Sequence, residues 1–289
     1  MKAKIINIFS VLFSFYKIIR YSNFFPSIRG IKINAESCSI LGNGPSLLDD
    51  IGSEIDYLQQ QDLFVVNFFA NSDLFFLLKP RYYILADPAF HTQDLPKNLK
   101  EKMRSLFDII ENKVDWNMIL IVPCRNIAFF RQKLSGNHCI ELMGYNAVDI
   151  NCVYAPFDNW AHDKQLAVLG SMNVVNVAAY LAVYMGYKKI HLLGVDHSWH
   201  NLFRVNSMNQ VIRIDPHFSD KCTPQEFVNK EKIHEELENS AKALKTYHLV
   251  QIYAQHRGSV IYTCCERSFI DAFPRKSLKE VVEQERVGK

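Results

Sequence analysis

Ile40-Leu-Gly-Asn-Gly-Pro-Ser-Leu47 is the stretch that decides the fold. A short apolar run, 37–41, leads directly into the turn Gly42-Asn43-Gly44, and a helical pattern begins at Pro45-Ser46. Glycine lets a backbone turn sharply and approach a ligand closely, and the first N–H groups of a helix carry partial positive charge that suits a phosphate. The stretch therefore predicts either a plain strand-to-helix turn or a turn that binds a phosphate-bearing ligand.

Short apolar runs alternate with helical patterns along the rest of the chain. The runs that we expect to form strands are 37–41, 63–66, 82–86, 118–122, 190–193 and 260–263. The segments that we expect to form helices are 47–60, 97–111, 173–185 and 226–246, with a further short helix in the charged tail from 275. This alternation predicts an α/β, Rossmann-like fold in which a mostly parallel sheet is flanked by helices.

Polar residues end four of the expected strands, namely Asn43, Asn67, Asp87 and Asp196. Parallel sheets bind ligands in the crevice outside the carboxyl ends of their strands, so these four side chains are expected around one crevice. Asn and Asp are also common helix caps and turn residues, which is the alternative role for each of them.

The first 35 residues contain six basic residues and no acidic one, whereas the chain as a whole has a net charge of +3. The apolar run 5–16 is shorter than the roughly twenty residues that cross a bilayer. A narrow polar stripe recurs at three- and four-residue steps, through Lys4, Asn7, Ser10, Ser14 and Lys17. The pattern predicts an amphipathic helix that lies in the surface of an anionic membrane through residues 1–25. A helix docked on the body of the protein, or an oligomer contact, is the alternative.

Several well-known chemistries are absent from the sequence. The glycine turn is followed by no Lys-Ser or Lys-Thr, so it is not a P-loop, and Leu47 replaces the third glycine of the dinucleotide fingerprint. The seven cysteines include no C-x-x-C pair, which argues against a disulfide framework and a zinc site and favours a reducing cytoplasm. His197 and His200 have a spacing that a metal pair can use, but a loop is expected there, and we expect no metal. No basic block with interleaved aromatic residues suggests a nucleic-acid partner.

Two stretches together resemble the bacterial sialyltransferases of glycosyltransferase family 42 and the related MptE-like domain of flagellin-modifying Maf proteins. They are 40–47 and 173–196, where a helix rich in Val and Ala leads into Lys-Lys-Ile-His-Leu-Leu-Gly-Val-Asp196. The resemblance implies a single GT-A-like nucleotide-binding domain that holds the cytidine monophosphate of a donor sugar. By position, the residues that would line the nucleotide are Gly42, Asn43, Gly44, Ser46, Asn67, Asp87, Asn173, Gly194, Val195 and Asp196.

The chain differs from that family at four positions. Asp87 stands where the family has Asn, and Gly170 stands where it has an arginine. The two phosphate-binding tyrosines of the family fall on Ser198 and near Arg204, and an arginine binds phosphate well.

The resemblance also implies inverting, metal-independent transfer with a histidine as general base. His234 is the nearest candidate by position, His217 remains open, and His197 and His200 are alternatives as base or as phosphate ligands. Arg204 and the histidines would supply charge or donors to the leaving phosphate.

Three functions remain open on the sequence. The first is a glycosyltransferase that uses a nucleotide sugar, possibly a CMP-linked nonulosonic acid, and extends a lipopolysaccharide or another lipid-linked glycan. The second is an MptE-like pyrophosphokinase that uses ATP and magnesium, and the third is an inactive membrane-associated scaffold. For the first, we expect no cofactor, a cytoplasmic location on the inner face of the plasma membrane and possible homo-oligomers. The expected organisation is a leader at 1–34, a transferase domain at 35–274 and a charged tail at 275–289.

Overall fold

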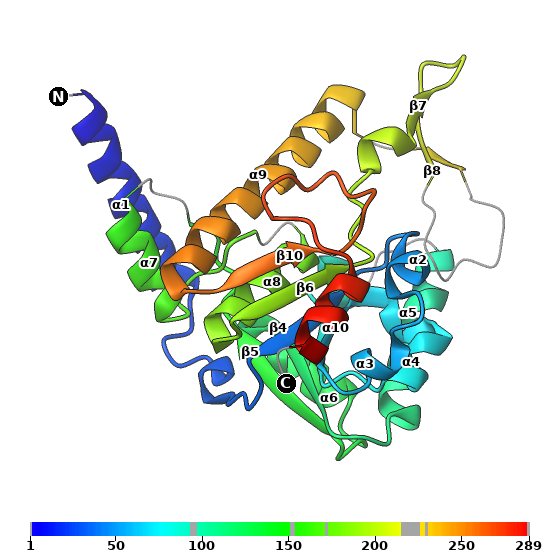
Figure 1. Ribbon diagram of the computed structural model, residues 1–289. Coiled ribbons are helices and arrows are strands. Elements are labelled where there is room, and N and C mark those ends of the chain that lie inside the picture. Colours follow the sequence, from blue (N-terminus) through cyan, green and yellow to red (C-terminus); the bar gives the residue numbers. More distant parts are fainter. Residues whose placement is uncertain are drawn as a thin grey trace.

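A seven-stranded sheet forms the centre of the protein in the computed structural model, which describes residues 2–92, 97–150, 154–170, 173–214, 226–228 and 231–287 (Figure 1). All of its strand pairs are parallel, and the strand order is β10-β6-β1-β2-β3-β4-β5. The strands are β1 Ser37–Leu41, β2 Asp62–Val66, β3 Tyr82–Ile84, β4 Met118–Pro123, β5 Ile140–Tyr145, β6 Lys189–Leu193 and β10 Val260–Thr263. The α/β, Rossmann-like class expected from the alternating pattern is confirmed.

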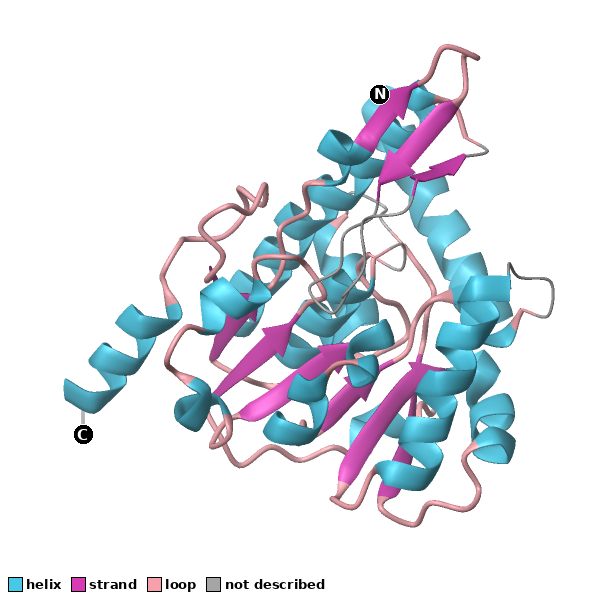
Figure 2. Ribbon diagram, turned by 90° about the vertical axis from the view of Figure 1, so that its right-hand side faces the viewer, coloured by secondary structure: helices cyan, strands magenta, loops and turns pink. Residues whose placement is uncertain are grey.

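Helices cover both faces of the sheet (Figure 2). One face packs against α8 Val174–Met185 and α9 Ile233–Arg257, and the buried core there is rich in aliphatic residues and tyrosines. The other face packs against α2 Leu47–Ile51, α3 Ile55–Leu58, α4 Asp73–Leu78, α5 Lys97–Lys113, α6 Ile127–Lys133 and α10 Leu278–Val287. A sheet that is buried on both faces explains why its strands read as continuous apolar runs.

Several elements differ from the sequence-based expectation. The expected helix 47–60 is divided into α2 and α3, because Gly52 ends α2 with a φ of 52°. The expected helix 226–246 begins later, at Ile233, and extends to Arg257, while Glu226–Val228 forms a strand. Strand β5 was not expected, because its residues are only partly buried over most of its length and show no clear apolar run.

A small antiparallel sheet lies beyond the carboxyl ends of the main strands (Figure 2). It consists of β7 Phe203–Val205, β8 Val211–Ile214 and β9 Glu226–Val228, in that order. The first turn of α9 lies near the same end of the molecule (Figure 1). This small sheet and the start of α9 therefore lie near the edge of the main sheet where ligands bind in such folds.

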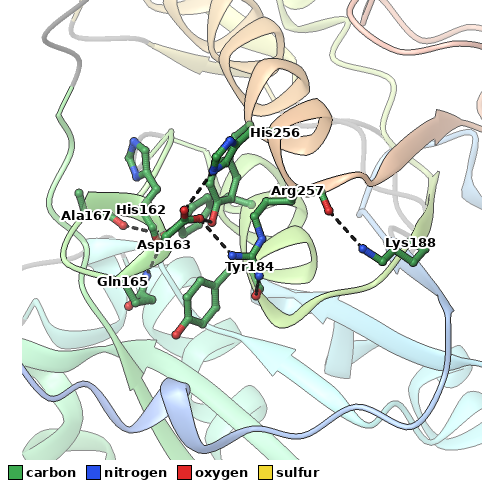
Figure 3. A network of polar contacts seen from close by, with 10 residues as sticks. His162, Asp163, Gln165, Ala167, Tyr184, Lys188, His256 and Arg257 are labelled. Carbon is green, nitrogen blue, oxygen red and sulfur yellow. Dashed lines mark hydrogen bonds and ion pairs between the residues drawn. The ribbon is translucent and has the colours of Figure 1, made fainter. Parts of the chain in front are cut away.

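Asp163 fixes the carboxyl end of α9 to the neighbouring helices (Figure 3). This residue ends α7 Ala155–Asp163, and its carboxylate lies 3.0 Å from His256 Nε2 and 3.1 Å from Arg257 Nη1. Tyr253 also donates its hydroxyl proton to the carboxylate, over 3.0 Å, and Arg257 reaches the carbonyl of Tyr184 at the end of α8. Basic groups at a helix C-terminus are electrostatically favourable, so this network holds α9 against the sheet.

In helix α1, Lys2–Tyr21, Ser14 and Lys17 of the polar stripe contact the body, whereas most of its described large apolar side chains are exposed. Ser14 and Ile18 are buried, and Lys17 Nζ donates to the carbonyl of Asp149 over 3.1 Å. The exposed large side chains of this helix are Ile8, Phe9, Leu12, Phe13, Phe15, Tyr16, Ile19 and Tyr21. The part of the chain that the structure describes contains no helix with the length and hydropathy of a membrane span.

Candidate functional site

The candidate site lies where the order of the strands reverses. From β1 the chain adds β2 to β5 on one side, and then crosses to place β6 on the other side of β1. The turn after β1 therefore meets the turn after β6 at the carboxyl edge of the sheet. This switch point is the place where open α/β sheets bind their ligands.

The glycines of both turns are required by close packing. The amide of Gly42 donates to the carbonyl of Leu193 and that of Gly44 donates to the carbonyl of Gly194, both over 2.8 Å. A Cβ on Gly44 would lie 1.9 Å from Asp196 Oδ2, and a Cβ on Gly42 would lie 2.3 Å from Gly194 O. Gly42 and Gly44 are not in the positive-φ region, so the turn after β1 needs their small size and not their conformational freedom, whereas Gly194 in the turn after β6 has a φ of 63°.

The start of α2 faces a carboxylate of the protein itself. Asp196 is 7% exposed, and its Oδ2 accepts from the hydroxyl of Ser46 over 3.0 Å and from the Ser46 amide over 3.3 Å. Asp50 Oδ2 also lies 3.0 Å from the Ser46 hydroxyl and accepts from the Gly194 amide over 2.8 Å. Burial raises the pKa of Asp50 above its usual value. Because a carboxylate already occupies this helix start, a phosphate is better accommodated elsewhere in the crevice.

A pocket of about 160 Å³ opens beside these turns. It is lined by Asn43, Gly44, Pro45, Val66, Asn173, Val174, Val175, Gly194, Val195, Asp196, His197, Ser198, Trp199 and Leu202. Ligand pockets for drug-sized molecules are typically about 300–1,000 Å³, so this volume suits one part of a nucleotide sugar. Six of the ten predicted nucleotide residues line it, namely Asn43, Gly44, Asn173, Gly194, Val195 and Asp196.

Asn43 connects the ends of β1 and β2. Its amide nitrogen donates to the carbonyl of Val66 over 3.1 Å, whereas its Oδ1 is buried and has no hydrogen-bond partner among the described residues. Buried polar atoms are nearly always paired, so an unpaired acceptor in the wall of a pocket is a place where a ligand can bind.

Asn67 and Asp87 end their strands as predicted, but they do not line the pocket. Asn67 has a φ of 47°, and its Oδ1 is buried without a hydrogen-bond partner among the described residues. Asp87 caps a short helical turn by accepting from the Ala89 amide over 2.8 Å. Asp87 therefore has the ordinary capping role that the sequence left open for it.

His197 is the most unusual residue of the pocket. It is 6% exposed, has a φ of 51°, and its Nε2 lies 2.7 Å from the hydroxyl of Tyr247. Its Nδ1 has no hydrogen-bond partner among the described residues. Burial lowers the pKa of His197 to about 3, so the ring is neutral near pH 7.

The other predicted catalytic residues that the structure describes lie outside the pocket lining. Arg204 is exposed on β7, where its guanidinium donates to the carbonyls of Asn201 and Phe203. His234 is exposed in the first turn of α9, and His200 packs its ring against Phe269. His217 lies outside the described residues.

Sequence reasoning did not identify Tyr247, Trp199 or Asp50 as parts of this site. Tyr247 reaches His197 from α9, fifty residues along the chain, and no local pattern marks that contact. Trp199 lies in the same segment as His197, and their rings are in contact. Asp50 lies in the first turn of α2, where acidic residues are common, so its sequence position does not mark it as part of a site.

The comparisons with known proteins include a distant structural likeness. No protein family model and no curated protein match the chain. The fold is similar to that of the Maf glycosyltransferase from Magnetospirillum magneticum AMB-1, with a TM-score of 0.49 and 12% sequence identity. The likeness covers 93% of this chain and 38% of that chain, so this chain spans less than half of its structural neighbour. A likeness this distant shows a similar fold and does not reveal an activity.

Proposed function

We propose that the protein is a glycosyltransferase whose nucleotide-sugar donor binds in the pocket between the ends of β1 and β6. The observation that carries the proposal is that this switch-point pocket contains buried polar atoms, Asn43 Oδ1 and His197 Nδ1, without partners among the described residues. A ligand rich in hydrogen-bond donors and acceptors would satisfy them, and a nucleotide is such a ligand.

The finer assignments follow from the sequence resemblance. The donor is a CMP-linked sugar of the sialic or nonulosonic acid kind, and the acceptor is a lipopolysaccharide or another cell-surface glycan. Transfer proceeds with inversion, with His234 or His217 as general base and Arg204 as a ligand of the leaving phosphate. Arg204 lies on β7 in the small sheet beyond the carboxyl ends of the strands, and His234 lies in the first turn of α9 (Figure 1). These elements are near enough to that edge of the sheet for an acceptor to be approached from them.

A nucleotide panel separates this function from the two alternatives. We expect CMP or CDP to raise the melting temperature without magnesium, because a ligand that binds the folded state at a hundred times its Kd stabilises it by about 2.7 kcal/mol. UDP, GDP and ATP, each with and without magnesium, complete the panel. A response to ATP with magnesium alone would support a pyrophosphokinase, and no response to any nucleotide would support a scaffold.

We further propose that the apolar face of α1 lies on an anionic membrane surface, next to a lipid-linked acceptor. Phe9 and Phe13 are 68% and 59% exposed, and the segment 1–35 carries only basic charges. Interfacial helices combine such an apolar face with basic residues that attract anionic headgroups. Ser14 and Lys17 of the polar stripe contact the body, so the exposed face of the described part of this helix is largely apolar.

Vesicle binding tests the membrane proposal. We expect Phe9→Ser/Phe13→Ser to weaken binding to phosphatidylserine-containing vesicles at least tenfold, because each buried Phe contributes about 1.5–3 kcal/mol. Ile252→Ser, which changes an apolar residue of α9 that is 57% exposed, is the matched control and should bind as the wild type does. Unchanged binding of the double variant, or an oligomer that dissociates on the double substitution, would contradict the proposal.

A further inference from the structure

His197 is held in a strained and buried position. Its φ of 51° lies in the left-handed region, which non-glycine residues seldom adopt, and its ring packs 4.2 Å from that of Trp199 between centroids. Such strain persists only where the surrounding structure enforces it, and it is concentrated at ligand sites. The position of His197 in the lining of the pocket makes its ring a candidate for ligand contact.

A chain of hydrogen bonds fixes which ring nitrogen of His197 carries the proton. Asn173 Oδ1 accepts from the Val175 amide over 2.8 Å at the start of α8, which turns the Asn173 amide nitrogen toward Tyr247 and His197. Burial raises the pKa of Tyr247 well above its usual value, against a smaller lowering by the hydrogen bond from Asn173. The Tyr247 hydroxyl therefore keeps its proton. The Asn173 amide nitrogen, which can only donate, lies 3.5 Å from His197 Nε2, so both neighbours of Nε2 are satisfied when the Tyr247 hydroxyl, 2.7 Å away, donates to it. Nε2 is then the acceptor, and the proton of the neutral ring lies on Nδ1.

The Nδ1–H group of His197 is consequently a buried donor without a protein partner among the described residues. Burying an unpaired donor is costly, and a ligand atom that accepts from it removes that cost. The donor is preorganised, because Tyr247 and Asn173 fix the tautomer before any ligand arrives.

The rest of the pocket indicates the kind of ligand group that binds there. Its described lining includes the carboxylate of Asp196 and no lysine or arginine, which is unfavourable for a phosphate. Val174, Leu202 and Trp199 contribute apolar and aromatic surface, and Asn43 Oδ1 contributes an unpaired acceptor. One donor and one acceptor among apolar walls suit the uncharged base and ribose of a nucleoside.

We propose that His197 is a ligand-binding residue whose Nδ1–H donates to the nucleoside part of the donor substrate, with the phosphate outside this pocket. The inference rests on the proposed function and assigns the chemistry of one part of the same site. It also implies that His197 is not the general base. Nε2 already accepts from Tyr247 and Nδ1 already carries a proton, so neither ring nitrogen is free to take a proton from an acceptor.

The tautomer is measured first, in the protein without ligand. Long-range proton–nitrogen NMR spectra of the protein labelled with nitrogen-15 in histidine should show His197 protonated on Nδ1 and bare on Nε2. Tyr247→Phe should mix the two tautomers, because it removes the donor to Nε2. Protonation of Nε2 in the wild type would overturn the inference.

Ligand titrations test the role of the donor. The probes are cytidine and CMP, the corresponding uridine, guanosine and adenosine pairs, and inorganic phosphate. We expect His197→Ala to weaken the binding of a nucleoside and of its monophosphate by the same factor, about tenfold, which corresponds to the loss of one hydrogen bond. His197→Asn should restore most of the affinity, because asparagine tolerates positive φ and carries an N–H donor near the Nδ1 position. His138→Ala, at an exposed position, is the control and should leave both affinities unchanged.

The outcomes distinguish this inference from the proposed function. The role of His197 would be overturned if His197→Ala left the affinity for nucleotides unchanged, or lowered the affinity for the monophosphate alone. Either result would leave the proposed function standing. Failure of every nucleoside and nucleotide to bind the wild type would overturn both. Displacement of cytidine by inorganic phosphate would contradict the placement of the phosphate outside the pocket.

Discussion

Gly44→Ala is expected to destabilise the protein by about 3 kcal/mol, and to lower the melting temperature by roughly 6–12 °C. The added Cβ would lie 1.9 Å from Asp196 Oδ2 and 2.6 Å from Gly194 O. Neither atom can move freely, because Asp196 accepts a hydrogen bond from Ser46 and the Gly194 carbonyl accepts one from the Gly44 amide. The substitution therefore forces apart the two turns that form the pocket, so nucleotide binding should be lost as well.

Gly30→Ala is the matched control for this substitution. A Cβ at Gly30 would meet no atom within 4 Å, and its φ is not positive. Its stability should stay within about 0.5 kcal/mol of the wild type, because surface substitutions away from special features are usually that mild. Thermal unfolding of both variants is the measurement. Equal melting temperatures for Gly44→Ala and Gly30→Ala would show that the two turns do not pack as described.

Acidification from pH 7.5 to pH 5 is expected to remove about 2 kcal/mol of stability for each of three buried histidines. Burial lowers the pKa of His162 and of His191 to about 4, and that of His197 to about 3. At pH 5 these residues are protonated in the unfolded chain and neutral in the folded one. The unfolded state then binds more protons, so stability is lost as the pH falls below the unfolded pKa of about 6.5. Asp50, whose pKa burial raises, acts in the opposite direction and offsets part of the loss.

A pair of identical substitutions isolates one of these histidines. His162→Gln should reduce the loss of stability between pH 7.5 and pH 5 by about 2 kcal/mol, because it removes a titrating group that is 2% exposed. His138→Gln, at an exposed site, should leave the loss as in the wild type. Urea unfolding at the two pH values measures both, and the cost of the substitution itself cancels in the difference. An undiminished loss in His162→Gln would show that this ring is protonated in the folded state.

The sequence predicted the parts of the fold that have a clear local pattern. The buried strands β1, β2, β4, β6 and β10 were visible as apolar runs, and the end of α8 was marked by Gly186, which has a φ of 106°. The partly buried β5 and the late start of α9 were not predictable in this way, because contacts distant in the chain determine them. Tertiary context commonly overrides local propensity in this manner.

The candidate site was predicted only in part, for a related physical reason. Polar residues at strand ends marked the crevice, and Asn43 and Asp196 do lie in the pocket. The sequence could not show that Asp196 forms a hydrogen bond with Ser46 at the start of α2, or that Tyr247 forms one with His197. Such contacts depend on how separate elements pack, and they alter the role of the residues involved.

The central claim, that a cytidine nucleotide binds without magnesium at the switch point between β1 and β6, is tested most directly by calorimetric titration of CMP and CDP into the wild-type protein without magnesium. The proposal predicts saturable binding of at least one of the two at one site per chain. Absence of binding for both, or binding only of ATP and only with magnesium, would contradict it.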